Sequence, residues 1–473
     1  MMSEKIKICL LGIYVFFGFL IGLLSCTQPA KQAAGNESVS PGASPPTQTA
    51  GSVPDFICRQ PPQLQPSLPA DSAFLTQADI NCFVWQEFIA LNWAASTTVP
   101  GEPDTGKGAA QFGDPTDGSR IVWQTYKLAD DVFLPNAQEP APWGGGTAPQ
   151  PSLWMTSKFS ATPALDQLND IFEPGKHTVT AQNGTLVRYE IRMNRDEFEY
   201  IRANGLYNAV NQYNAVQPNG PGISLPDGSA QFATYGKVGA IEIKAAWLEL
   251  TDASLRPRYK TMEAQICPDK TGQNCRTAIV GLVGLHIAHK TSSMPQWVWA
   301  TFEHVDNAPD KNEVRGNQLK ASYAFYNPAC DTSRCPPNQT PTPDPPSPSD
   351  PPTQVVEMTP LPDEVKSLNQ AVQSLIAQQN PDSVWQYYRL VNVIWPQSGV
   401  KIPAGAQVPL DQGSATPTLE MGGVANPVLE TYVQQTATCF DCHSYAAVAK
   451  TKQEAKPQWA SDYSFLLSRA QEP

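Results

Sequence analysis

The chain has 473 residues, a formal net charge of −12 and a hydrophobic content of 41%, which is ordinary for a folded protein. A chain of this length can bury one large core or two moderate ones. The acidic balance argues against nucleic acid as a partner and favours a basic docking partner, where one exists. Eleven tryptophans favour a β-rich interior over a helical bundle.

The amino-terminal segment has the pattern of an export leader. Two lysines precede an apolar run that closes on Leu-Leu-Ser-Cys at residues 23–26. This box resembles the lipobox of bacterial lipoproteins, which implies that residues 1–25 are removed and that Cys26 carries the lipid. Such a protein is anchored to the periplasmic side of a membrane, and Thr27 in the second mature position is associated with the outer membrane. The alternative is a retained membrane-spanning helix, because the apolar run approaches the length that a bilayer needs.

A flexible tether and a β-rich region are expected next. Residues 26–55 are rich in proline, serine, threonine and alanine and almost without large apolar side chains. The β-rich region covers residues 56–335, and apolar residues at helical spacing predict a helix over 78–95 within it. Strands are predicted over 186–193, 237–250, 260–267, 277–290 and 296–305. Because sequential strands with short connections pair side by side, we expect an antiparallel sheet.

Residues 336–355 are dominated by proline, threonine, serine and aspartate, so they cannot pack a core. The tract either separates two domains or is an insertion in one. Insertion is favoured, because residues 356–473 hold too few strands to close a sheet alone. That last segment is expected to contain a helix from 362, a central strand over 384–395 and a short helix over 426–433.

The fold class expected from these elements is α+β. It is a largely antiparallel, β-rich domain with a few peripheral helices. A short helical segment near the carboxyl terminus completes it and carries the most informative motif of the chain.

Residues 439–443 read Cys-Phe-Asp-Cys-His, which is the C-x-x-C-H spacing of c-type haem attachment. Two intervening residues place both thiols on one turn of backbone, where they can bond to the vinyl groups of one haem while the next imidazole reaches its iron. We therefore expect one covalent haem c at Cys439 and Cys442, with His443 as the proximal iron ligand. The alternatives are a chance pattern, a redox C-x-x-C and a zinc site, and an export leader favours haem over all three.

The iron's sixth ligand is the open question. Small soluble class I cytochromes carry this motif near the start of the domain and take an axial methionine from downstream, whereas no methionine or histidine follows His443. Met421 and His286 are the upstream candidates. An ordinary loop or core role is an equally good interpretation of Met421, and a hydrogen-bonded core or surface imidazole is the favoured interpretation of His286. On a strand, His286 and His289 face opposite ways, while His286 and Lys290 share a face.

The cysteine count connects the two ends of the chain. Of the ten cysteines, Cys9 leaves with the leader, Cys26 takes the lipid, and Cys439 and Cys442 take the haem. An oxidising compartment lets the other six form disulfides. Six cysteines allow fifteen connectivities, and local pairing is favoured because the intervening loops are short. The expected pairs are Cys58 with Cys82, Cys267 with Cys275, and Cys330 with Cys335.

Two resemblances add to this interpretation. A little-studied group of bacterial proteins, labelled only as cytochrome c family, resembles most of the mature chain, and this implies haem binding. The runs that carry the resemblance are residues 284–286, 297–304, 430–432 and 439–446. The carboxyl-terminal motif followed by residues 462–465 is similar to small β-sheet monohaem cytochromes that oxidise hydroxylamine or bind nitric oxide, whose iron is five-coordinate. In their catalytic members a strand lysine is cross-linked to the haem, for which Lys244 and Lys290 are the possible positions.

Three hypotheses follow. The first is a lipid-anchored monohaem cytochrome that exchanges electrons with a redox partner protein. The second is a haem enzyme acting on small nitrogen oxides or peroxide at an open iron, in a pocket roofed by apolar side chains of strands 277–290 and 296–305. The third is a β-sandwich that binds sugar or peptide and carries an auxiliary haem, because the strand-rich region exceeds what a haem needs for burial. The iron's coordination, and not the fold, separates the first two.

Overall fold

A computed structural model describes residues 58–72, 76–145, 152–154, 178–267, 274–341, 350–396, 408–409, 423–435 and 438–473. Residues 53–473 form one compact unit. The expected leader, the lipid-bearing Cys26, the tether and Met421 lie outside the described residues. In the described part of the chain, no helix combines the length and the apolar character needed to cross a membrane.

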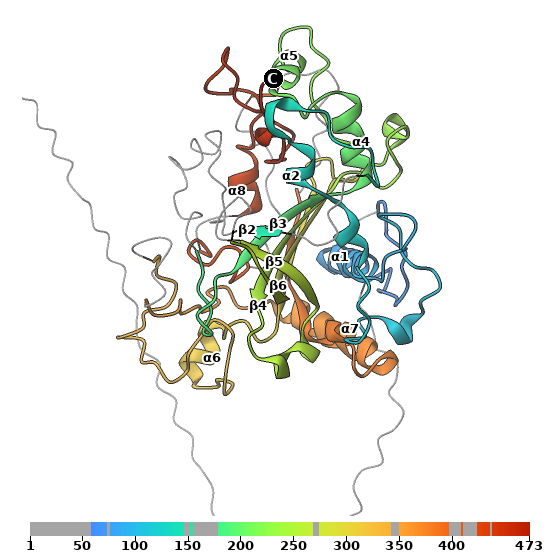
Figure 1. The fold of residues 1–473 in the computed structure, drawn as a ribbon. Helices are drawn as coiled ribbons and strands as arrows, with labels where there is room; N and C mark the ends of the chain where they lie inside the picture. The colour runs from blue at the N-terminus through green and yellow to red at the C-terminus, as the bar shows by residue number, and fades with distance from the viewer. Residues whose placement is uncertain are drawn as a thin grey trace, which may run out of the picture. The chain divides into compact units, whose positions relative to one another are not determined.

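An eight-stranded sheet forms the centre of this unit (Figure 1). Its strands are β1 (Lys127–Leu128), β2 (Ser152–Trp154), β3 (Arg188–Met193), β4 (Ile241–Glu249), β5 (Thr261–Cys267), β6 (Arg276–His289), β7 (Val298–His304) and β8 (Tyr388–Ile394). All neighbouring strands run antiparallel except β2 and β5, which run parallel. The long β6 pairs with β4 along one edge and with β5 and then β7 along the other. The predicted α+β, β-rich class is therefore confirmed, and each of the five strands predicted within residues 56–335 forms.

Helices α1 (Gln77–Leu91) and α7 (Asp363–Gln379) cover one face of the sheet (Figure 1). Thr76 caps α1 through a reciprocal capping box with Asp79. The indole of Trp85 on α1 donates to Asn369 on α7 at 3.1 Å and so connects the two helices. Apolar side chains of β4, β6, β7 and β8 pack against them in the largest core cluster. The two helices therefore bury this face of the sheet.

The opposite face of the sheet carries the carboxyl-terminal segment. One row of cross-strand neighbours runs through Met193, Glu242, Ala288, Trp299 and Ile394. The four apolar members of this row pack with Phe440 and Tyr463 of the terminal segment. The next row on the same face consists of Ile191, Lys244, His286, Thr301 and Asn392.

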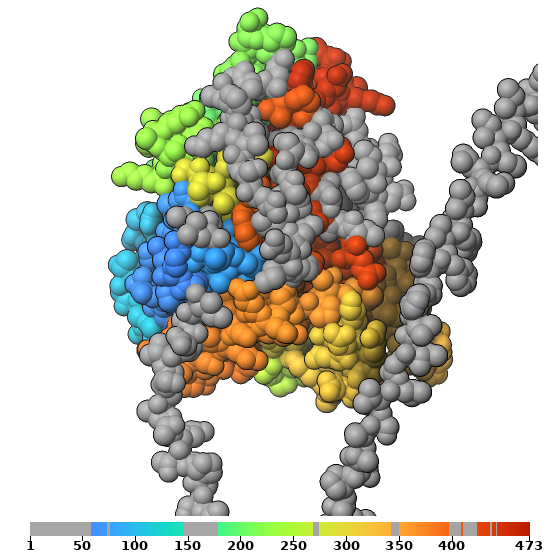
Figure 2. Space-filling model, turned by 180° about the vertical axis from the view of Figure 1, so that it is seen from behind, coloured from blue at the N-terminus to red at the C-terminus, as the bar shows by residue number. Residues whose placement is uncertain are grey.

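Five shorter helices complete the described structure: α2 (Ala129–Val132), α4 (Arg195–Ala203), α5 (Ala209–Ala215), α6 (Lys311–Gly316) and α8 (Cys439–His443). The start of α5 is hydrogen-bonded to the terminal segment, where Ala209 N–H donates to the Gln471 carbonyl at 3.0 Å. In Figure 2 the terminal segment, in red, lies beside residues coloured green, the range that includes α4 and α5. Helices α4 and α5 thus belong to the same side of the sheet as residues 439–443.

Two predicted elements differ from the structure. The strand expected from residue 384 begins only at Tyr388, because Ser383 accepts a hydrogen bond from Trp385 N–H and starts a single 3₁₀ turn. The helix expected over 426–433 is wrong, since these residues form successive turns. The side-chain amide of Asn426 donates to the Phe302 carbonyl of β7 at 2.9 Å, and its side-chain oxygen accepts from Val428 N–H. These contacts anchor the segment to the sheet in place of a regular helix.

The structure joins six cysteines in the three expected pairs, Cys58–Cys82, Cys267–Cys275 and Cys330–Cys335. The first ties the start of the described chain to α1, and the second spans the connection from β5 to β6. Around the proline-rich tract, Asn338 N–H donates to the Gln354 carbonyl at 2.8 Å. The two ends of the proline-rich tract therefore lie next to each other.

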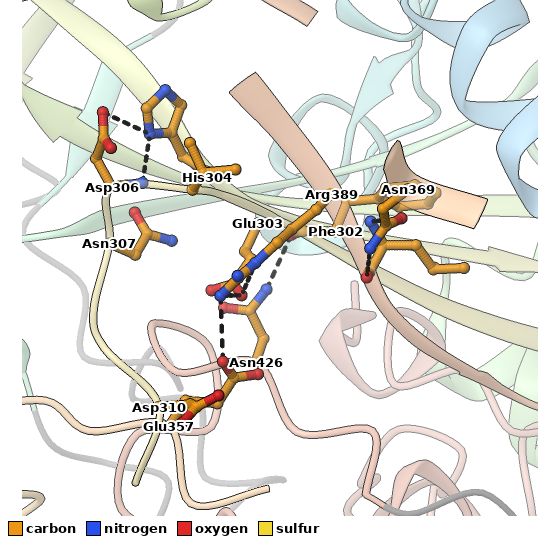
Figure 3. Close-up of polar contacts among 12 residues, drawn as sticks. Phe302, Glu303, His304, Asp306, Asn307, Asp310, Glu357, Asn369, Arg389 and Asn426 are labelled. Atoms are coloured by element: carbon orange, nitrogen blue, oxygen red, sulfur yellow. Dashed lines mark hydrogen bonds and ion pairs between the residues drawn. The ribbon is translucent and has the colours of Figure 1, made fainter. Parts of the chain in front are cut away.

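A buried ion cluster connects β7, β8 and the segment before α7 (Figure 3). The Arg389 guanidinium lies 2.7 Å from a Glu303 carboxylate oxygen and 3.2 Å from one of Glu357. Both glutamates are fully buried. Within the described structure one oxygen of each carboxylate lacks a hydrogen-bond partner. One cation thus holds two carboxylates in the interior.

Candidate functional site

The C-x-x-C-H motif forms the single helical turn α8, Cys439–His443. Residues three apart lie on one face of a helix, so the two cysteines face the same way. Both are half-buried, and neither takes part in the three disulfides. Phe440 is buried and packs edge-on against Trp299 and Tyr463, which fixes the turn to the sheet. The two half-buried cysteines therefore belong to a turn that is anchored to the sheet.

His443 is held in a defined orientation. Its Nδ1 lies 2.7 Å from the Tyr463 carbonyl oxygen. A carbonyl only accepts, so Nδ1 carries the proton, and in the neutral ring the lone pair is on Nε2. The imidazole centroid lies 4.2 Å from that of Trp299 and 4.8 Å from that of Phe465. This is how metal-binding histidines are usually fixed: one nitrogen donates to the protein and the other is available to the metal.

Burial of the imidazole lowers the pKa of His443 to about 4, and electrostatic interaction with Lys244 and His286 adds to the effect. The residue as a whole keeps some exposed surface, but the ring lies in a desolvated environment. At neutral pH the side chain is therefore uncharged. Only an uncharged imidazole has a lone pair to give to a metal.

A polar group on the sheet faces this side. His286 Nε2 lies 3.1 Å from a Glu430 carboxylate oxygen, and the second oxygen of Glu430 accepts from Asn426 N–H at 2.9 Å. Lys244 is the cross-strand neighbour of His286. The sheet thus offers His443 both the apolar Trp299 and a row of polar side chains. On this face β6 and β7, the strands expected to roof an open iron with apolar side chains, contribute His286 and Thr301 as well as Ala288 and Trp299.

The remaining histidine and lysine candidates have structural partners. His289 faces away from His286, as predicted, and its Nδ1 bonds the buried carboxylate of Glu87 on α1. His304 stacks on Tyr259 with centroids 3.8 Å apart and bonds a backbone carbonyl. Lys290 forms an ion pair with Asp462. Of the candidates for the sixth ligand, His286 lies beside the motif, while Met421 is outside the described residues.

The described residues contain no group of three His, Cys, Asp or Glu side chains arranged to hold a metal ion. A haem makes no such demand, because the porphyrin supplies four ligands and the protein only one or two. The donor set fits a haem c: two accessible thiols on one face of a turn and a neutral imidazole directed by a backbone carbonyl.

The sequence did not reveal what holds the motif. The group that orients His443 is the backbone carbonyl of Tyr463, and the role of a backbone carbonyl cannot be recognised from the residue type. Trp299 and Phe465 occur in the runs that carry the resemblances, but nothing in those runs places them on either side of one imidazole.

None of the protein-family models, curated proteins or solved structures compared with this chain matches it. The geometry of the site is therefore the basis for assigning a function.

Proposed function

We propose that this chain is an exported, lipid-anchored c-type cytochrome that carries one haem and transfers electrons. Cys439 and Cys442 attach the haem and His443 is the proximal ligand of its iron. The observation that supports this most is the hydrogen bond from His443 Nδ1 to the Tyr463 carbonyl, beside two accessible thiols of one helical turn. When bound, the haem supplies reversible iron redox chemistry. The residues of the chain attach it, orient the imidazole and keep water from the ring with Trp299 and Phe465.

The proposed location is the periplasmic side of a bacterial membrane, with the outer membrane favoured and Cys26 as the lipid-bearing residue. Three disulfides suit an oxidising compartment. The net charge of −12 suits a redox partner protein with a basic docking surface.

Covalent attachment is tested on full-length protein exported from cells that mature c-type cytochromes. Wild type should keep haem peroxidase staining on a denaturing gel and gain the mass of one haem. The double variant Cys439→Ala/Cys442→Ala should lose both the staining and the added mass. The control Cys330→Ala/Cys335→Ala removes a disulfide outside the motif and should keep both. His443→Ala should retain the attached haem but lose the strong axial field. Release of haem from denatured wild type would end the proposal.

A second candidate is a haem enzyme with an open distal position. The polar group of Lys244, His286 and Glu430 favours it, because side chains that donate protons near an iron suit reactions of small nitrogen oxides or peroxide. If the site is open, ferrous protein should bind carbon monoxide readily, and His286→Ala should leave the resting spectrum unchanged. A low-spin spectrum that does not change when carbon monoxide is added would exclude the enzyme. A change of that spectrum in His286→Ala or Met421→Ala would identify the sixth ligand.

A further inference from the structure

The turn at residues 461–464 adopts a backbone conformation that side chains normally avoid. Asp462 and Tyr463 have φ angles of 56° and 66°, so two consecutive residues other than glycine are left-handed. Each such residue costs on the order of 1 kcal/mol and persists only where its surroundings hold it. The second of them supplies the carbonyl that accepts from His443 Nδ1. The strained backbone and the orientation of the proximal histidine are therefore one structural feature.

Three separate elements hold Asp462. Its Oδ2 binds the ammonium group of Lys290, which directly follows β6, and also accepts from Leu225 N–H at 2.7 Å. Its backbone carbonyl accepts from the indole N–H of Trp297, just before β7, at 3.1 Å. The side chains of Lys290 and Asp462 are 3% and 0% exposed. Residues next to the ends of β6 and β7 thus hold the turn through both the side chain and the backbone carbonyl of Asp462.

The same turn is tied to the haem motif. Ser461 N–H donates to the Ala446 carbonyl at 2.9 Å, three residues after His443. The hydroxyl of Ser461 donates to the Ser464 carbonyl at 2.6 Å and closes the turn. The turn is therefore hydrogen-bonded on one side to a residue next to the sheet and on the other side to the segment that follows the motif.

The ion pair is poorly placed to stabilise the fold. Burying two charges has a desolvation penalty that the attraction between them often fails to repay. Burial raises the pKa of Asp462, with a contribution from the charge of Asp227. The carboxyl groups of Glu197 and Glu242 are also close enough to interact with Asp462 electrostatically. The placement of one lysine among several acidic groups is therefore better explained by the backbone geometry that the ion pair fixes than by a gain in folding free energy.

We propose that Lys290 and Asp462 are positioning residues for the proximal histidine. Their ion pair fixes the left-handed turn, so that the Tyr463 carbonyl holds the His443 imidazole in one tautomer and one orientation. This inference rests on the proposed haem function. A hydrogen bond from Nδ1 to a fixed acceptor makes the imidazole a stronger electron donor to a bound metal. A stronger donor favours ferric over ferrous iron, so the pair lowers the reduction potential.

Two variants and one control test this in the full-length haem-loaded protein. Asp462→Asn keeps the shape and removes the charge, and Lys290→Met/Asp462→Asn removes both charges in case the single variant fails to fold. Glu87→Gln is the matched control, because it breaks the buried pair with His289, one residue before Lys290 on the opposite face. Measurements are the midpoint potential and the iron–histidine stretching frequency of the ferrous protein by resonance Raman spectroscopy.

We expect a higher midpoint potential and a lower iron–histidine frequency in both Asp462 variants, with covalent haem retained. Glu87→Gln should leave both quantities at the wild-type values. Wild-type values in the Asp462 variants, or equal shifts in Glu87→Gln, would overturn the proposal. Absence of covalent haem from the wild type would instead contradict the proposed function.

A readout without haem separates these outcomes further. The chain has five histidines, so ¹⁵N-histidine labelling gives a simple spectrum. In full-length Cys439→Ala/Cys442→Ala protein, His443 should be the Nδ1–H tautomer. Adding Asp462→Asn should produce a mixture with the Nε2–H form. A single Nδ1–H tautomer in both proteins would show that the ion pair does not orient the imidazole.

Discussion

The buried carboxyl pair Glu197 and Glu242 should make the stability of this fold fall as the pH rises. Glu197 on α4 is fully buried, and neither of its carboxyl oxygens has a donor among the described residues. Glu242 on β4 keeps some exposed surface, but its Oε1 is buried and also lacks a donor in the described structure. The two carboxyl groups lie close enough together to interact electrostatically. Burial raises the pKa of both, that of Glu242 to about 7.

The size of the effect follows from the shift. The pKa of Glu242 rises from an ordinary 4.5 to about 7, and each unit corresponds to about 1.4 kcal/mol. A carboxyl whose pKa is raised by folding stabilises the protein fully below the unfolded pKa, and this contribution is lost as the pH rises through the folded pKa. Glu242→Gln has a neutral side chain of nearly the same shape that can donate to Glu197. Relative to wild type, its free energy of unfolding should rise by about 3 kcal/mol between pH 4.5 and pH 8.

Guanidinium unfolding followed by far-UV circular dichroism at several pH values measures this difference. Glu249→Gln is the control, because it removes a carboxylate paired with Arg276 from the same strand and leaves the buried pair intact. The control should follow the pH dependence of the wild type. A constant difference in the free energy of unfolding between Glu242→Gln and wild type over the whole pH range would refute the raised pKa of Glu242.

Further changes have defined outcomes. Arg389→Met leaves Glu303 and Glu357 buried without their cation, so it should cost about 3–5 kcal/mol of unfolding free energy at neutral pH, and a loss below 1 kcal/mol would contradict the cluster. Removing the Cys58–Cys82 disulfide, which spans 24 residues, should cost about 3.5 kcal/mol on the chain-entropy model, measured by denaturant unfolding. Cys26→Ala should release the protein from membranes in cell fractionation, and continued tight binding would favour a retained membrane helix.

The main elements were predictable because local pattern and burial agree in them. Strands β3 to β7 lie where β-branched and aromatic residues cluster between turn residues. Helix α1 lies where apolar residues recur at helical spacing, between a Thr76 cap and Asn92. The segment over 426–433 was mispredicted because Asn426 bonds Phe302 of β7, a residue more than a hundred positions away. Asn426 accepts from Val428 N–H as a helix cap would, but tertiary contacts decided the structure of the segment.

The candidate site was likewise only partly predictable from the sequence. The motif at 439–443 is local, so its residues could be named from the sequence. Alternation along β6 correctly placed His286 and His289 on opposite faces and Lys290 with the former. What His443 and Lys290 touch depends on how the terminal segment crosses the sheet. The contacts of Tyr463 and Asp462 with them join residues up to 172 positions apart and have no sequence signal.

The arrangement of the sheet also suggests why so many strands accompany one C-x-x-C-H motif. A separate ligand-binding sandwich was one explanation, since the strands exceed what a haem needs for burial. The described strands form one sheet, with helices on one face and the terminal segment on the other. Residues in or next to β6 and β7 supply the ring beside His443, the indole that holds Asp462 and the lysine paired with it. The sheet is then the rigid support of the site, and no second binding module is needed to account for its size.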